Sequence, residues 1–514
     1  MEFRYGVDRM TISDANALLD GKVKGVLSDE AVNRIEKGFE DLRRLAESNR
    51  PIYGINTGFG VLCREIIGKD KRSSLQVNLL RSHACGVGDT VEDDIVKLML
   101  ILKLHTLAYG YSGVSVGVVK RILWHLENGI LPVVYKYGSV GASGDLIPLA
   151  HLFLPLIGEG KVRTERGIEA SSEVLKRYGL EPLLLHPKEG LALINGTQFI
   201  GAYAVYGLRK MARLLDVSEI VAALSCEAYK ASAKPFDSRL IGLKPYDGAV
   251  YTASRMRALL KDSQILSSHI NCNRVQDPYS FRCIPQVHGA AREAFYHLKR
   301  VVEIEINSVT DNPVVIDGEA YSGGNFHAET IAMALDYASI AVSELANISD
   351  RRVFALLAGD GEEVPRMLVE DAGVNSGFML TQYATASLVG RMKSLTHPAS
   401  SDSIPTSLGQ EDHVSMGSVS AERFNMVLDD LEWVLAVELL VASQAFQFRR
   451  PLRSSKPVEE VFAAVRELVP FVHHDEVLSE YIRRLKGLIS DNGFLSRINA
   501  MINDDTGLKE KYVC

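Results

Sequence analysis

The feature that most restricts the fold of this chain is a set of long apolar stripes at helical spacing. From Phe424 to Phe446, apolar side chains recur every three or four residues, which places them on one face of an α-helix, and Pro451 follows as a helix breaker. Similar stripes run from Ile331 to Leu345 and from Tyr203 to Tyr229. Strand-like stretches are scarce and short, at Pro313–Asp317 and Lys161–Glu165. The pattern predicts a mainly α protein, a bundle of long helices with small β pieces.

Glycine-rich loops interrupt the helical pattern and suggest how the chain is organised. They lie at residues 54–60, 138–144 and 323–325. We expect three parts: an N-terminal domain at 1–195, a central long-helix bundle at 196–450, and a C-terminal helical tail at 451–514.

Composition excludes several classes of protein. The 514 residues carry a net charge of −7, and the basic residues are scattered, so we expect no nucleic-acid partner. The N-terminus is charged where a secretory signal would be apolar, and the longest apolar stretches fall short of the ~20 residues that cross a bilayer. The six cysteines form no CxxC pair, which is typical of reduced thiols. We therefore expect a cytoplasmic protein with no membrane partner.

Common cofactor and nucleophile motifs are missing from the sequence. It contains no GxGxxG dinucleotide loop, no GxxxxGK[ST] phosphate loop and no HExxH or Cys/His ligand spacing. The segment GASGD is not a GxSxG nucleophile elbow, because Asp145 stands where the last glycine should be. We therefore expect no metal.

The tripeptide Ala142-Ser143-Gly144 could be a simple turn into a helix that starts near Asp145, but one chemistry requires these residues in this order. The backbone nitrogen of Gly144 can attack the carbonyl carbon of Ala142 and close a five-membered ring. Loss of water, including the Ser143 hydroxyl, then leaves 4-methylideneimidazol-5-one, a strong electrophile. Glycine gives the nitrogen the freedom to approach, and a following helix N-terminus favours negative charge on the ring.

Eight blocks, spread from about residue 50 to residue 450, resemble the motifs of the aromatic amino acid ammonia-lyases and aminomutases, and most closely those of the members that act on histidine. They are YGINTGFG (Tyr53–Gly60), SHACGVG (Ser82–Gly88), GSVGASGDLIPLAH (Gly138–His151), KEGLALINGTQ (Lys188–Gln198), VQDPYSFRCIPQVHGA (Val275–Ala290), NSVTDNP (Asn307–Pro313), GGNFHAE (Gly323–Glu329) and QEDHVSMG (Gln410–Gly417). The resemblance implies an all-α fold of the ammonia-lyase (fumarase/aspartase-like) superfamily. It also implies a homotetramer whose active sites draw on three subunits. The implied reaction is the deamination of L-histidine to trans-urocanate and ammonia, the first step of histidine degradation, through the methylideneimidazolone.

The resemblance also implies roles for individual residues. Tyr53 matches the catalytic base, and Tyr279 matches a second active-site tyrosine. Arg282 matches the residue that binds the substrate carboxylate, and Asn195 matches one that contacts the ring and the amino group. The remaining matches are the cofactor-forming Ala142, Ser143 and Gly144 with Asp145 assisting, and the pocket positions Gln276, Asn312 and Phe326.

The resemblance implies that His83 and Glu411 determine substrate choice, because they match the two positions that contact the substrate side chain. Glu411 is typical of histidine-acting members, whereas aromatic-acting members carry an amide there. A carboxylate accepts a hydrogen bond from an imidazole N–H and would be poorly satisfied beside a phenyl ring.

Two alternatives remain open. The first alternative is a lyase or 2,3-aminomutase that acts on tyrosine or phenylalanine, because Arg81 is similar to the arginine of some tyrosine-acting bacterial members. The other is a non-catalytic helical assembly, but that class predicts loss of Ser143, Tyr53 or Arg282, and all three are present.

Overall fold

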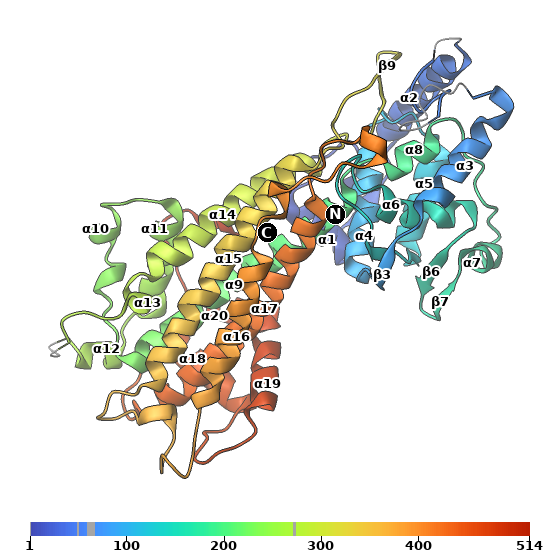
Figure 1. Cartoon of the computed structure of the whole chain (residues 1–514). Coiled ribbons are helices and arrows are strands. Elements are labelled where there is room, and N and C mark those ends of the chain that lie inside the picture. The colour runs from blue at the N-terminus through green and yellow to red at the C-terminus, as the bar shows by residue number, and fades with distance from the viewer. Residues whose placement is uncertain (1, 49–50, 59–66, 271–273) are drawn as a thin grey trace. The chain divides into compact units, whose positions relative to one another are not determined.

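The three long apolar stripes are helices in the computed structural model of the chain, which describes residues 2–48, 51–58, 67–270 and 274–514 (Figure 1). They form α9 (Gln198–Tyr229), α15 (Glu329–Leu357) and α17 (Gly417–Gln447). The side chains of the Phe424–Phe446 stripe are buried, and α17 ends before Pro451. The mainly α fold is thereby confirmed. The predicted strand pieces also form, as β6 (Lys161–Thr164) and β8 (Val314–Ile316).

The chain divides into two compact units, each built from three separate segments. Unit 1 contains residues 1–208, 298–336 and 398–422, and unit 2 contains residues 209–297, 337–397 and 423–514. Four helices contribute residues to both units, namely α9, α15, α17 and α14 (Ile284–Glu305). The three-part division predicted from the sequence runs along the chain and stays a prediction.

Unit 1 combines short helices with small two- and three-stranded sheets. Its helices are α1 (Ile12–Leu19), α2 (Asp29–Glu47), α3 (Arg72–His83), α4 (Asp93–Leu107), α5 (Val116–Glu127), α6 (Leu146–Phe153), α7 (Ser171–Arg177) and α8 (Glu189–Ile194). One of its sheets pairs β1 (Glu2–Arg4) with β2 (Lys24–Val26) in parallel. The other three described sheets are antiparallel. One pairs β3 (Val87–Thr90) with β5 (Tyr135–Tyr137), one pairs β8 with β9 (Glu319–Tyr321), and in the third β6 lies between β4 (Leu131–Pro132) and β7 (Gly167–Ala170).

The described part of unit 2 consists of helices and the loops that connect them. Besides its shares of the long helices it contains α10 (Ser238–Ile241), α11 (Asp247–Leu259), α12 (Gln264–Ser268), α13 (Tyr279–Arg282), α16 (Met379–Leu395), α18 (Lys456–Leu468), α19 (Leu478–Ser490) and α20 (Asn492–Ala500).

Of the helices that the structure describes, α15 alone is long and apolar enough, by length and composition, to cross a membrane. Within its most apolar stretch, 67% of the helix is buried inside the protein, as in the core helix of a folded domain.

Candidate active site

The loop that carries Ala142-Ser143-Gly144 is joined to a second loop at the start of α9. Gly144 and Gly196 form a parallel bridge, and the Asp145 backbone N–H donates to the Gly196 carbonyl at 2.7 Å. The Asn195 side-chain amide donates to the Ser143 carbonyl at 2.6 Å. These three contacts fix the tripeptide against the 195–196 loop.

Asp145 lies fully buried between the two loops and binds both of them. Its Oδ1 accepts from the Ser139 hydroxyl at 2.8 Å, and its Oδ2 accepts from the backbone N–H groups of Phe199 and Ile200 at 3.0 Å each. The carboxylate therefore caps the N-terminus of α9, a favourable place for negative charge. Burial raises the pKa of Asp145 to about 7, while these three donors act in the opposite direction.

Lys103 also holds the 195–196 loop, and the sequence did not predict it as a site residue. It is fully buried on α4, and its Nζ donates to the Asn195 carbonyl at 2.7 Å. Burial lowers its pKa to about 7. The signal in the sequence was a lysine inside an otherwise apolar run, Val96–Leu104, where a charge needs a buried partner.

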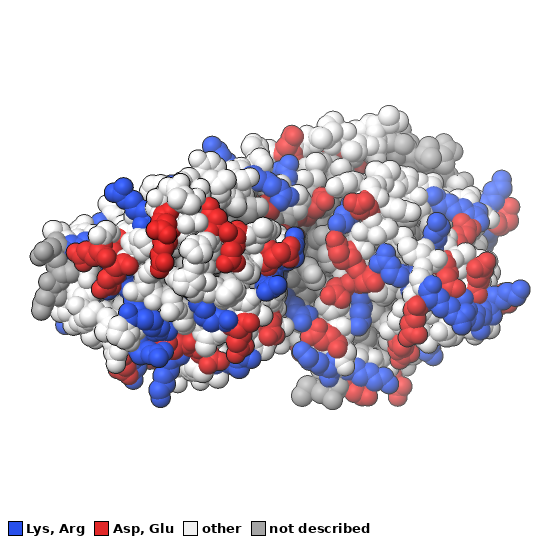
Figure 2. Space-filling model, turned by 90° about the horizontal axis from the view of Figure 1, so that it is seen from below, with Lys and Arg blue, Asp and Glu red and all other residues white. Residues whose placement is uncertain are grey.

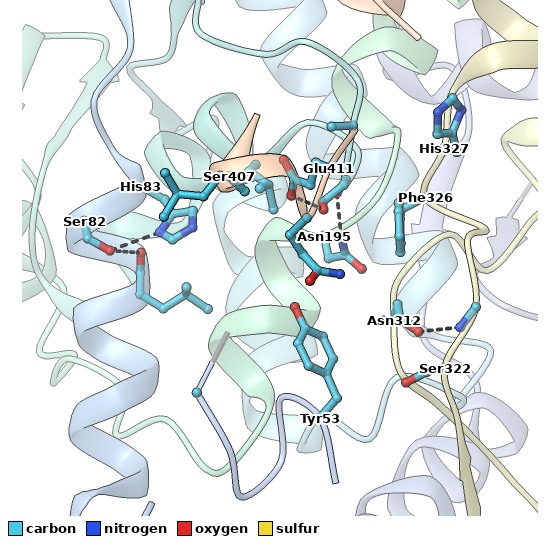
Figure 3. A pocket seen from close by; sticks show the side chains of 18 of the residues that line it. Tyr53, Ser82, His83, Asn195, Asn312, Ser322, Phe326, His327, Ser407 and Glu411 are labelled. Carbon is cyan, nitrogen blue, oxygen red and sulfur yellow. Dashed lines mark hydrogen bonds between the residues drawn. The ribbon is translucent and has the colours of Figure 1, made fainter. Parts of the chain in front are cut away.

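The tripeptide faces a cavity of about 1020 Å³ within unit 1 (Figure 3). Eight of the sequence-predicted site residues line it, brought together from seven of the eight motif blocks: Tyr53, His83, Ala142, Ser143, Asn195, Asn312, Phe326 and Glu411. Figure 3 shows Tyr53 with its hydroxyl pointing into the cavity, His83 on one side, and Phe326 and Asn312 on the other. Phe59, Gly60, Cys63 and Cys272 lie outside the described residues.

The end of the cavity near His83 and Glu411 is polar. His83 Nδ1 lies 3.0 Å from the Ser82 hydroxyl oxygen. Burial lowers the pKa of His83, so its neutral imidazole is favoured near pH 7. Glu411 accepts from the Ser143 hydroxyl at 2.6 Å through Oε1 and from the Thr406 hydroxyl at 2.8 Å through Oε2.

Asn195 leaves one acceptor unused in the same cavity. Its Nδ2 donates to Ser143, but its Oδ1 is buried and has no hydrogen-bond partner among the described residues. A buried amide oxygen without a donor is costly, about 1–3 kcal/mol, so this atom is suited to a ligand that brings an N–H group.

Gln276, Tyr279 and Arg282 belong to unit 2, whereas the residues that line the cavity belong to unit 1. The Arg282 guanidinium lies 4.5 Å from the centre of the Tyr279 ring, a cation–π distance. Its Nε is buried without a hydrogen-bond partner in the part of the chain that is described.

Arg81, which raised the question of a tyrosine substrate, does not line the cavity. It is exposed, and its Nε donates to Glu159 at 2.9 Å. The residue therefore makes a surface ion pair in this chain.

Two observations concern metals and thiols. Among the described residues, one group could hold a metal ion: His327, Glu329 and His413, whose ligand atoms lie within 4.8 Å of one another at the cavity wall. The expectation of a metal-free protein therefore stays a prediction. The four described cysteines, at positions 85, 226, 283 and 514, form no disulfide.

Comparison with known proteins defines the class. A family model described as aromatic amino acid lyase matches residues 10–467, so the chain belongs to the aromatic amino acid lyase family and is a carbon–nitrogen lyase.

Within this family the chain is similar to histidine ammonia-lyase of Sorangium cellulosum, at 46% identity over 88% of this chain and 89% of that protein. Its fold matches the crystal structure of histidine ammonia-lyase from Trypanosoma cruzi with a TM-score of 0.91, at 36% identity over 100% of this chain and 98% of that one. It also matches tyrosine aminomutase from Streptomyces globisporus, with a TM-score of 0.91 at 33% identity, over 98% of this chain and 99% of that one.

Proposed function

We propose that the protein is a histidine ammonia-lyase, which converts L-histidine to trans-urocanate and ammonia. The observation that carries this proposal is the pair His83 and Glu411 at the polar end of the cavity that Ser143 faces. An imidazole placed there satisfies both side chains, because its N–H can donate to the carboxylate and its other nitrogen can accept from the neutral histidine. A phenyl ring would satisfy neither.

The residues of the tripeptide fit the proposed methylideneimidazolone. Gly144 has a φ of +76°, and a Cβ there would lie 2.2 Å from the Gly196 carbonyl oxygen, so only glycine is accommodated. Ala142 is small, and Ser143 faces the cavity with its hydroxyl. The group supplies an electrophile that binds the substrate amine and turns it into a better leaving group.

Tyr53 and Asn195 act on the substrate in this proposal. The phenolate of Tyr53, which points into the cavity in Figure 3, takes the β-proton, and the C–N electrons leave with ammonia as the double bond forms. The Oδ1 of Asn195, which has no hydrogen-bond partner among the described residues, accepts from the substrate amino group and orients it. Asp145 ties the tripeptide loop to the start of α9, and Lys103 holds the 195–196 loop in place.

The carboxylate clamp comes from other copies of the chain. Arg282 has a fork of donors that matches a carboxylate, it belongs to unit 2, and its Nε is buried without a hydrogen-bond partner among the described residues. A homotetramer in which Gln276, Tyr279 and Arg282 complete a neighbour's site explains these facts together. Large apolar side chains that are 42–65% exposed along α15 and α16 support such an assembly: Tyr337, Ile340, Phe354, Leu380 and Tyr383.

The protein is proposed to work in the cytoplasm on a small amino acid, without nucleic-acid or membrane partners. Figure 2 shows acidic and basic side chains interspersed over the visible face, as expected for a surface that does not recruit a polyanion.

Kinetics with L-histidine, L-tyrosine and L-phenylalanine test the substrate. We expect kcat/KM for histidine to exceed that for phenylalanine by about 10- to 100-fold or more, because phenylalanine brings no donor to the Oε1 of the half-buried Glu411. His83→Leu should narrow this gap. A wild-type preference for tyrosine would overturn the proposal, and a β-amino acid product would assign an aminomutase. Ser143→Ala should fold but lose nearly all activity, and full activity would exclude the methylideneimidazolone.

A further inference from the structure

The carboxylate of Glu411 lies at the atom that must leave when the methylideneimidazolone forms. With the Ser143 side chain intact, its hydroxyl donates to Glu411 Oε1 at 2.6 Å. The short distance is typical of a hydrogen bond to an ionised carboxylate. The polar end of the cavity therefore includes a contact made before any substrate arrives.

Glu411 is held in this position from two directions. The Thr406 hydroxyl donates to its Oε2 at 2.8 Å. The backbones of Thr406 and Glu411 also pair, with Thr406 N–H to Glu411 O at 2.8 Å and Glu411 N–H to Thr406 O at 3.3 Å. The side chain that contacts Ser143 is thus fixed by its own short bridge.

Dehydration of Ser143 poses a specific chemical problem. The Cα–H and Cβ–Oγ bonds break, a Cα=Cβ double bond forms, and water leaves. The Cα proton needs a base, negative charge develops on the Ser143 carbonyl oxygen, and hydroxide departs readily only if it is protonated.

Two groups at Ser143 meet these needs. The Asn195 amide donates to the Ser143 carbonyl oxygen at 2.6 Å and stabilises the charge that develops there. Glu411 contacts Oγ. A second carboxylate nearby, the buried Asp145, is already bound to Ser139, Phe199 and Ile200 and holds the loop against α9.

We propose that Glu411 catalyses the dehydration of Ser143 during formation of the methylideneimidazolone, in addition to reading the substrate. The carboxylate takes the Cα proton, the pair of electrons forms the double bond, and the resulting carboxylic acid gives the proton to Oγ as the Cβ–O bond breaks. Glu411 ends the step ionised, one water is released, and no external acid or base is consumed. The inference rests on the proposed function, because it concerns the electrophile that function requires.

The test measures the mass of the peptide that spans residues 142–144, without reference to turnover. Wild type should lack two waters relative to the encoded sequence, one from ring closure and one from Ser143. Glu411→Gln keeps the size of the side chain but cannot take a proton, so its peptide should retain the Ser143 water, with dehydration at least 10-fold slower in a time course after synthesis. His83→Leu is the matched control, since it alters the same cavity end and should lose both waters normally.

A second variant keeps the test decisive if Glu411→Gln fails to fold. Thr406→Val removes the hydroxyl that holds Glu411 Oε2 while preserving shape, and dehydration should slow several-fold. Wild-type dehydration rates in folded Glu411→Gln, or in Thr406→Val, would overturn this role and leave Glu411 as a substrate reader alone. A wild-type peptide that retains both waters would instead overturn the proposed function itself, and this role with it.

Discussion

Replacing Gly144 by alanine tests whether the close approach of the two loops is needed for the site. Gly144 has a φ of +76°, which costs an L-residue about 1–2 kcal/mol. Its new Cβ would also lie 2.2 Å from the Gly196 oxygen, where ordinary contacts begin at 3.4 Å, so the loops must separate by more than an ångström. That movement breaks the 2.7 Å bond from Asp145 N–H to Gly196, at about 1–3 kcal/mol for a buried group.

The expected loss of unfolding free energy for Gly144→Ala is therefore about 2–5 kcal/mol. Gly129→Ala is the matched control: its φ is +62°, and nothing lies within 4 Å of the added Cβ. The control should lose only about 1–2 kcal/mol and remain fully active.

Urea unfolding, the mass of the 142–144 peptide and histidine turnover measure the two variants side by side. Because a displacement of about 1 Å can reduce a rate about 100-fold, Gly144→Ala should lose at least that much activity and retain both waters, even where it is folded. Equal stability of the two variants, or normal loss of both waters in Gly144→Ala, would refute the argument from the close approach.

Three further outcomes are expected. Tyr53→Phe removes the oxygen proposed to take the β-proton, so kcat should fall about 100- to 10,000-fold while KM changes little; an unchanged kcat would assign the base elsewhere. Arg282→Lys keeps the charge but loses the fork, and should cost about 2–4 kcal/mol in kcat/KM; unchanged kinetics would make this arginine structural. Burial lowers the pKa of His105 and of His125 from 6.5 to about 4. Between pH 4 and pH 6.5 the unfolded chain therefore binds more protons than the folded chain. The free energy of unfolding is highest above pH 6.5 and falls towards pH 4, by up to about 3 kcal/mol for each histidine. Equal midpoints of urea unfolding at pH 7 and pH 4.5 would contradict this prediction. So would a loss of stability at pH 4.5 that is as large in His125→Gln as in the wild type.

The helical fold could be predicted from the sequence because apolar periodicity is a local signal. The Phe424–Phe446 stripe is buried in α17, and the short strands β6 and β8 form where β-branched residues cluster. The joining of Gly144 to Gly196 could not be predicted in this way, because no local pattern states which two loops meet.

Sequence motifs predict which residues form the candidate site, but they do not predict the contacts that these residues make. Lys103 was seen only as an interruption of an apolar run, although it supports the Asn195 backbone. Arg81 resembles the arginine of some tyrosine-acting members, yet it is bound to Glu159 on the surface. Arg282 belongs to unit 2, whereas the cavity belongs to unit 1, and its proposed role in a neighbour's site depends on an assembly that a single chain does not contain. Each of these outcomes depends on tertiary or quaternary neighbours.

Unit 1 is built from three separate segments of the chain, so the residues of the site are synthesised at different times. Ser143 and Glu411 are separated by 268 residues, and the last segment of the unit ends at residue 422. At about 5–20 residues per second, a ribosome needs roughly 15–50 s to make the intervening chain. During that interval Ala142-Ser143-Gly144 already exists, but Glu411 and the cavity wall around it have not yet been synthesised. If Glu411 catalyses the dehydration of Ser143 as proposed, the electrophile forms only after the segment that carries Glu411 has been made, and a chain that ends before residue 411 keeps the Ser143 hydroxyl.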